Sequence, residues 1–158
     1  MNVNLYAFGR EISFDQGYGW AHHRCGWAHS TVAHNVVVVN EKNQLRKAAG
    51  SGGSLEQFCQ SPRVRVVTAD APMAYSAESV RRYRRLLALV DTGRDASYVL
   101  DTFDVAGGDQ HDMSQHFIGN LVRCDDATFG RPQTSGSLAG LQYEWWKLIQ
   151  PSGWLRGQ

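Results

Sequence analysis

The sequence predicts an all-β protein, built as an antiparallel β-sandwich. Short runs of β-branched and aromatic residues recur along the chain, and clusters of Gly, Asp, Asn and Pro separate them. No segment carries a clear helical period. A chain of 158 residues can bury one sizeable core but is short for two typical domains. We therefore predict a single β-sandwich domain over residues 1–158.

Composition excludes several classes of partner. The formal net charge is +1, which gives no electrostatic reason to bind nucleic acid or an anionic membrane. The chain has no apolar run of about 18 residues, so we expect no membrane span. Its start, MNVNLYAFGRE, lacks the basic and apolar regions of a signal peptide. Three widely spaced cysteines without a CxxC pair argue against a disulfide framework and a thiolate zinc site.

The first half of the chain predicts two strands and the loop that joins them. Residues 3–15 form the first strand, with Gly9-Arg10 as a kink or short turn. Residues 16–30 form a loop that is unusually rich in Gly, Trp and His. Residues 31–40 form a second strand, which the β-branched run Val36-Val37-Val38-Val39 places in the core.

The second half predicts a hairpin between shorter strands. Residues 46–54 read as a flexible surface loop, and residues 69–80 as irregular. Arg63-Val64-Arg65-Val66-Val67-Thr68 alternates like a half-exposed strand. By periodicity alone, residues 81–90 could form a helix or a strand. The turn Asp91-Thr92-Gly93-Arg94-Asp95 and the alternating residues 97–103 that follow it favour a strand and a hairpin. The two remaining strand predictions are residues 111–118 and the weaker apolar cluster at 141–149.

Asp15 and His34 are the candidate metal ligands. Each stands at the end of a predicted strand, where a carboxylate and an imidazole could share a metal ion or a substrate group. Zinc takes at least three protein ligands, so a further one is needed; His22, His23 or His29 in the loop could supply it. The plainer alternative is an Asp that caps a turn and a hydrogen-bonded His.

Other polar and aromatic residues admit both a ligand role and a structural role. His111 follows a Gly-Gly turn, so it either orders the turn or lines a cleft, and His116 reads as a satisfied structural residue. The arginines that flank Tyr83 could hold carboxylates. Because neighbours on a strand point to opposite sides, we instead expect alternate arginines to face solvent. Trp20 and Trp27, in the His-rich loop, are the best candidates for stacking on sugar rings.

Three blocks of the sequence resemble the C-terminal domain of the heparinase II/III-like polysaccharide lyases, which include alginate-lyase relatives. The blocks are LYAFGREISFDQGYG (5–19), STVAHNVVVVNEKNQ (30–44) and YRRLLALVDTGRDASYVLDTFDVAGGDQHDMSQHFIG (83–119). They follow the family's order and include its RR-hairpin and its GG-x-x-HD-x-x-x-H run. The likeness covers roughly residues 3–119.

The resemblance implies a fold, a metal and a substrate. Family members join an α/α-toroid catalytic domain to a β-sandwich, and the cleft between them binds an acidic polysaccharide that is cleaved by β-elimination. It implies that Asp15 and His34 are two ligands of one zinc ion, with a third in an HxHxD motif just upstream. Trp20, Trp27 and His111 are our candidate substrate contacts from their residue types and places in the sequence. A periplasmic or secreted location is implied for the full-length protein.

The chain also departs from the family pattern. The toroid, with its catalytic Tyr, His and Asn, is expected upstream, so we assign no catalytic residue here and regard the chain as a fragment. Val36 stands where Thr or Ser commonly follows His-Asn. Trp20 and Trp27 stand where some alginate-degrading relatives use Tyr, so alginate specificity is not carried over. The alternatives are a non-catalytic carbohydrate-binding or structural sandwich, or a gene fragment inactive alone; an exposed sheet edge would favour a homodimer.

Overall fold

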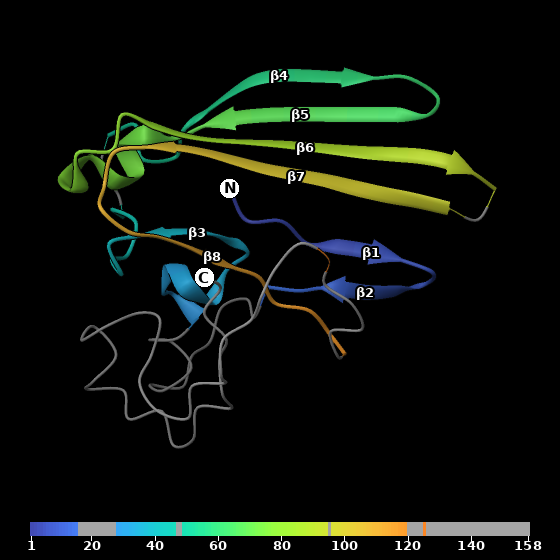
Figure 1. Cartoon of the computed structure of the whole chain (residues 1–158), viewed down its shortest axis with the longest axis horizontal. Coiled ribbons are helices and arrows are strands. Elements are labelled where there is room, and N and C mark those ends of the chain that lie inside the picture. Colours follow the sequence, from blue (N-terminus) through green and yellow to red (C-terminus); the bar gives the residue numbers. More distant parts are fainter. Residues whose placement is uncertain (16–27, 47–48, 95, 120–124, 126–158) are drawn as a thin grey trace. The chain divides into compact units, whose positions relative to one another are not determined.

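A computed structural model describes residues 1–15, 28–46, 49–94, 96–119 and 125. In these residues the chain is mostly antiparallel β-structure with two short 3-10 segments, which confirms the all-β prediction (Figure 1). Contacts divide the chain into two compact units, one of residues 43–111 with Met1 and one of residues 2–42 and 112–158. The single domain over residues 1–158 stays a prediction. No helix in the described ranges is long and apolar enough to cross a membrane.

The first unit contains a four-stranded antiparallel sheet in which sequence neighbours pair (Figure 1). Its strands are β4 (Ser54–Gln60), β5 (Val64–Asp70), β6 (Arg82–Gly93) and β7 (Ala96–Ala106). The prediction of a strand near residues 63–68 and of a hairpin over residues 81–103 is therefore confirmed. Residues 69–80, predicted irregular, contain the 3-10 segment η2 (Pro72–Glu78).

Side chains of β6 alternate across the sheet at its N-terminal end. Tyr83 and Arg85 are buried, whereas Arg82 and Arg84 are exposed. Tyr83 packs between Tyr75 of η2 and Phe103 of β7, with ring centroids 5.2 and 5.3 Å apart. This end of the sheet therefore carries the core of the first unit.

Strand β4 has no counterpart among the sequence predictions. All seven residues of β4 are exposed, so buried and exposed positions do not alternate along its sequence, SLEQFCQ. That alternation is the signal by which a sequence predicts a half-buried strand. Its pairing with β5 is interrupted by a bulge between Leu55 and Gln57.

The second unit begins with a tight hairpin of β1 (Leu5–Ala7) and β2 (Arg10–Ser13). The predicted single strand over residues 3–15 is thus divided in two. Phe8 and Gly9 join the strands, and both have positive φ, 54° and 75°. Two consecutive positive φ values are typical of the type I′ turn that matches the twist of a hairpin.

The predicted strand over residues 31–40 is correct only in its second part. Residues 31–33 form the 3-10 segment η1 (Thr31–Ala33), closed by a hydrogen bond from the His34 N–H to the Thr31 carbonyl. Strand β3 (Val36–Val39) follows, and all four valines are buried, as predicted. β3 pairs with β8 (His111–Ser114), which is shorter than the predicted strand over residues 111–118. The predicted strand over residues 141–149 lies outside the described residues.

Candidate metal site

Asp15 and His34 lie side by side in the second unit. The His34 Nδ1 and Asp15 Oδ2 atoms are 2.8 Å apart, although nineteen residues separate them in the sequence. The two side chains are 28% and 24% exposed, so a small ion can reach them from solvent. The carboxylate can only accept a hydrogen bond, so Nδ1 donates and carries the proton in neutral His34.

Local backbone structure positions both residues. Asp15 follows β2 after one residue, and His34 is the residue at which η1 ends. Two residues later the chain enters β3, whose four buried valines anchor this segment in the core. His34 is therefore held between a hydrogen-bonded turn and a buried strand.

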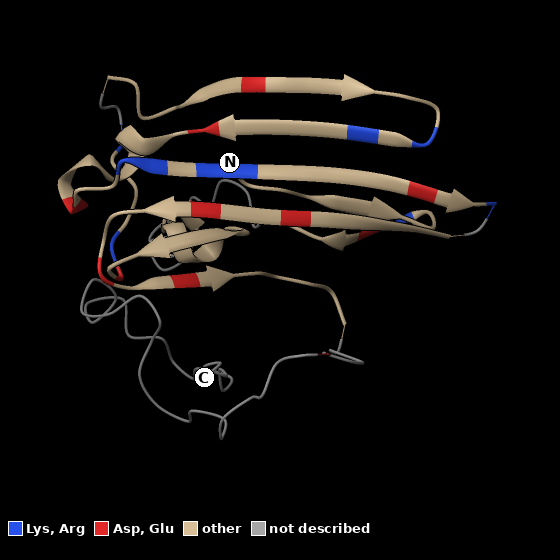
Figure 2. Ribbon diagram, turned by 45° about the horizontal axis from the view of Figure 1, so that its top comes forward, with Lys and Arg blue, Asp and Glu red and all other residues tan. Residues whose placement is uncertain are grey.

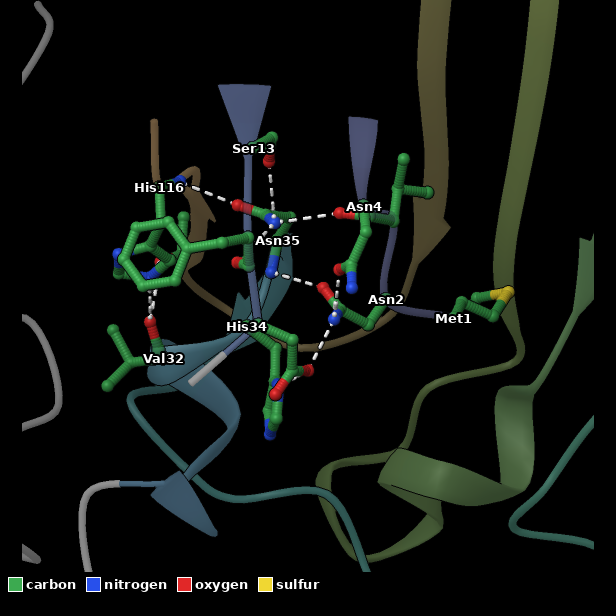
Figure 3. Close-up of polar contacts among 12 residues, drawn as sticks. Met1, Asn2, Asn4, Ser13, Val32, His34, Asn35 and His116 are labelled. Atoms are coloured by element: carbon green, nitrogen blue, oxygen red, sulfur yellow. Dashed lines mark hydrogen bonds and ion pairs between the residues drawn. The ribbon is translucent and has the colours of Figure 1, made fainter. Parts of the chain in front are cut away.

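Asn35 is the structural centre of this region (Figure 3). Its side chain is almost completely buried, and its Oδ1 accepts a hydrogen bond from the His116 N–H at 2.6 Å. Its Nδ2 faces three acceptors: the Val3 carbonyl at 2.8 Å, Ser13 Oγ at 2.9 Å and the Phe14 carbonyl at 3.3 Å. One amide group therefore ties together three segments that are distant in the sequence.

Asn2 connects Asn35 to the candidate ligands. The Asn35 N–H donates to Asn2 Oδ1 at 2.8 Å. The Asn2 Nδ2 donates in turn to Asp15 Oδ2 at 2.5 Å and to Asn4 Oδ1 at 3.2 Å. Asp15 Oδ2 thus accepts from both Asn2 and His34. The sequence predicted the Asp15 and His34 pair but neither Asn2 nor Asn35.

An imidazole nitrogen and a carboxylate oxygen are both common zinc donors, so this pair fits the chemistry of zinc. The pair supplies two donors, whereas even a catalytic zinc site takes three from protein. Within the residues that the structure describes, no third His, Cys, Asp or Glu completes a group able to hold a metal ion. His29 therefore does not complete the site there, and His22 and His23 lie outside the described residues.

His111 and His116 both make hydrogen bonds to main-chain carbonyls. The exposed His111 has its Nε2 2.8 Å from the Gly107 carbonyl, an arrangement that orders the Gly-Gly turn. His116 Nε2 lies 2.8 Å from the Val32 carbonyl and 3.1 Å from Ser114 Oγ, which agrees with a structural role. Substrate contact by His111 stays a prediction. Trp20 and Trp27 lie outside the described residues.

The arginines beside Tyr83 are paired with acidic residues of their own sheet. Figure 2 shows basic positions on β6 beside acidic positions on the neighbouring strand β7. Arg82 contacts Asp104 at 2.6 Å, and Arg84 contacts Glu56 at 2.7 Å. Both arginines are about half exposed, at 50% and 45%, as expected for alternate residues on the open face of a strand. Arg85 instead points to the buried side of the strand, as the alternation requires.

Comparison with known proteins adds no identification: no family model, curated protein or solved structure matches this chain.

Proposed function

We propose that this chain is the β-sandwich portion of a heparinase II/III-like polysaccharide lyase. Three sequence blocks in the family's order support the proposal, and they cover roughly residues 3–119. The observation that carries it is the contact between Asp15 and His34. Those are the two positions at which the resemblance implies metal ligands, and nineteen residues of sequence separate them.

In this proposal, Asp15 and His34 hold a structural zinc ion together with a ligand from an upstream HxHxD motif. Zinc in such a site would stiffen the wall of the substrate cleft. Asn2 would orient the Asp15 ligand by a hydrogen bond, and Asn35 would in turn orient Asn2. Hydrogen bonds to metal ligands commonly fix the geometry of a metal site in this way.

The reaction we propose for the intact enzyme is β-elimination on a uronate-containing polysaccharide. A base removes the proton at C5, the electron pair forms the C4–C5 double bond, and the C4 oxygen leaves with a proton from an acid. The uronate carboxylate must be neutralised in the transition state. These roles belong to the upstream toroid, and Trp20, Trp27 and His111 of this chain would line the substrate rim. Such an enzyme would act in the periplasm or outside the cell.

Zinc content tests the metal assignment. In the full-length protein, Asp15→Ala and His34→Ala should each lose bound zinc by elemental analysis. Asp91→Ala and His111→Ala are matched controls, since both residues are exposed and belong to the first unit. They should keep the wild-type zinc content. Unchanged zinc after substitution of Asp15 or His34 would refute the assignment.

Product formation tests the enzymatic assignment. The full-length protein should generate unsaturated uronate ends on acidic polysaccharides, detected by their ultraviolet absorbance. Glycan binding without product would instead favour a non-catalytic carbohydrate-binding protein. If the protein shows no glycan binding and forms no product, the result would favour a chain with no independent carbohydrate function.

A further inference from the structure

The polar contacts around Asn35 form a directed series that ends at His34 (Figure 3). The Asn35 N–H can only donate, and it faces Asn2 Oδ1 at 2.8 Å. This contact orients the Asn2 side-chain amide and turns its Nδ2 toward Asp15, whose Oδ2 lies 2.5 Å away. The direction of each hydrogen bond therefore follows from the one before it.

The same carboxylate oxygen also faces His34 Nδ1 at 2.8 Å. A carboxylate that accepts from Asn2 is held in place and can accept a second hydrogen from the imidazole. The neutral ring then carries its hydrogen on Nδ1, which leaves the lone pair on Nε2. A base or a hydrogen-bond acceptor needs that lone pair.

We propose that Asn2 is a positioning residue that holds Asp15 against His34 and thereby selects the imidazole tautomer with its hydrogen on Nδ1 and its lone pair on Nε2. Asn35 anchors the series, because its buried side chain is fixed by bonds to Val3, Ser13 and His116. Asn2 itself is exposed, so it can be replaced without opening the core. The zinc consequence rests on the proposed function, whereas the tautomer does not.

The test compares Asn2→Ala with Asn4→Ala by nitrogen-15 NMR of the imidazole at alkaline pH, where imidazoles are neutral. Asn4 is the matched control, because it accepts the second hydrogen of the same Asn2 amide at 3.2 Å. Wild type and Asn4→Ala should show His34 with hydrogen on Nδ1. Asn2→Ala should show a mixture of both tautomers, and retention of the wild-type pattern would overturn the proposal.

Zinc affinity of the full-length protein gives a second readout. Asn2→Ala should weaken zinc binding by about 10- to 100-fold, because it removes the hydrogen bond that orients the Asp15 carboxylate. Asn4→Ala should leave the zinc affinity unchanged. Unchanged affinity in Asn2→Ala would also count against the positioning role. If the wild-type protein binds no zinc, the metal assignment fails, and the tautomer spectra still decide the role of Asn2.

A measurement on the wild-type chain covers the case in which Asn2→Ala does not fold. The Asn2 side-chain hydrogens, bonded to Asp15 and Asn4, should exchange with solvent more slowly than those of the exposed Gln60 on β4. Equal exchange rates would overturn the proposal without any variant.

Discussion

Arg85 and Asp101 form a two-point ion pair on the buried side of the β6–β7 hairpin. The Arg85 Nε lies 2.8 Å from Asp101 Oδ1, and Nη2 lies 2.6 Å from Oδ2. The two side chains are 3% and 17% exposed. The guanidinium also stacks on Phe103, 4.8 Å from the ring centroid, and donates to the Met1 carbonyl at 2.6 Å. Arg85 is thus a buried charge that Asp101, Phe103 and the Met1 carbonyl contact within the first unit.

Removing one partner of this pair should destabilise the protein strongly. Asp101→Ala leaves the Arg85 guanidinium buried without its carboxylate, and we expect a loss of about 3–5 kcal/mol in the free energy of unfolding. The half-exposed Asp104, which pairs with Arg82, is the control, and Asp104→Ala should cost less than about 1 kcal/mol. Urea unfolding followed by circular dichroism measures both. Equal losses would contradict the distinct role of the buried pair.

Gly53 should not tolerate a side chain, whereas its neighbour Gly52 should. A Cβ on Gly53 would lie 2.6 Å from both the Asp70 carbonyl oxygen and the Ala71 Cβ, and the φ of Gly53 is +75°. Gly53→Ala should therefore cost about 2 kcal/mol or more. A Cβ on Gly52 would meet nothing within 4 Å, so Gly52→Ala should change stability by less than about 0.5 kcal/mol.

The urea midpoints of the two glycine variants provide the comparison. A Gly53→Ala midpoint equal to that of Gly52→Ala would mean that the loop before β4 relaxes to admit the methyl group.

Phe8 is a poor residue for the turn that it occupies, so replacing it should stabilise the second unit. Its φ is 54°, a left-handed conformation that is unfavourable for Phe. Its side chain is 83% exposed, so burial of the ring does little to offset that cost. Asn tolerates this conformation better, and Phe8→Asn should raise the free energy of unfolding by about 0.5 kcal/mol.

Tyr6→Asn is the control for this substitution. Tyr6 is also exposed, at 73%, but it lies in β1, where Asn has a lower propensity than Tyr. Its thermal midpoint should not rise. A rise in both variants would point to loss of exposed aromatic surface as the cause, and not to the turn.

Zinc should stabilise the second unit selectively. If Asp15 and His34 are ligands, zinc at 100 times its dissociation constant should stabilise the folded full-length protein by about 2.7 kcal/mol. Hydrogen exchange should slow in the described residues of this unit on either side of the pair, 2–15 and 28–42, and a chelator should reverse the effect. Protection confined to strands β4 to β7, or no protection at all, would contradict the metal assignment.

Sequence patterns predicted the parts of the fold in which burial follows a simple rule. The valines of β3 form a continuous apolar run, and the β6–β7 hairpin alternates around a turn rich in Asp and Gly. Strand β4 was missed because nothing in it is buried, so its strand conformation depends on pairing with β5. Residues 31–33 were assigned to a strand because β-branched residues favour one, but hydrogen bonds to Ser30 and Thr31 close a 3-10 turn there.

The pair of Asp15 and His34 was predictable from the sequence, but the residues that hold the pair were not. Asp15 and His34 are of metal-binding types, which a sequence shows directly. Asn2 and Asn35 are amides that also occur in any surface turn, and only tertiary contacts identify their roles. The nearest signal in the sequence was Asn35 itself, a polar residue directly before a run of four valines.

The contacts of Asn35 also bear on the order in which the chain acquires its structure. The acceptors of its side chain lie within the first fourteen residues, but the donor to its Oδ1 is the His116 main chain, eighty-one residues later. During synthesis the chain leaves the ribosome from its N-terminal end, so this last bond must wait for the sheet of residues 54–106 to emerge. Such a long loop closure is entropically costly and slow. We therefore expect the surroundings of Asp15 and His34 to become rigid only late in folding, after the hairpins of the sheet have formed.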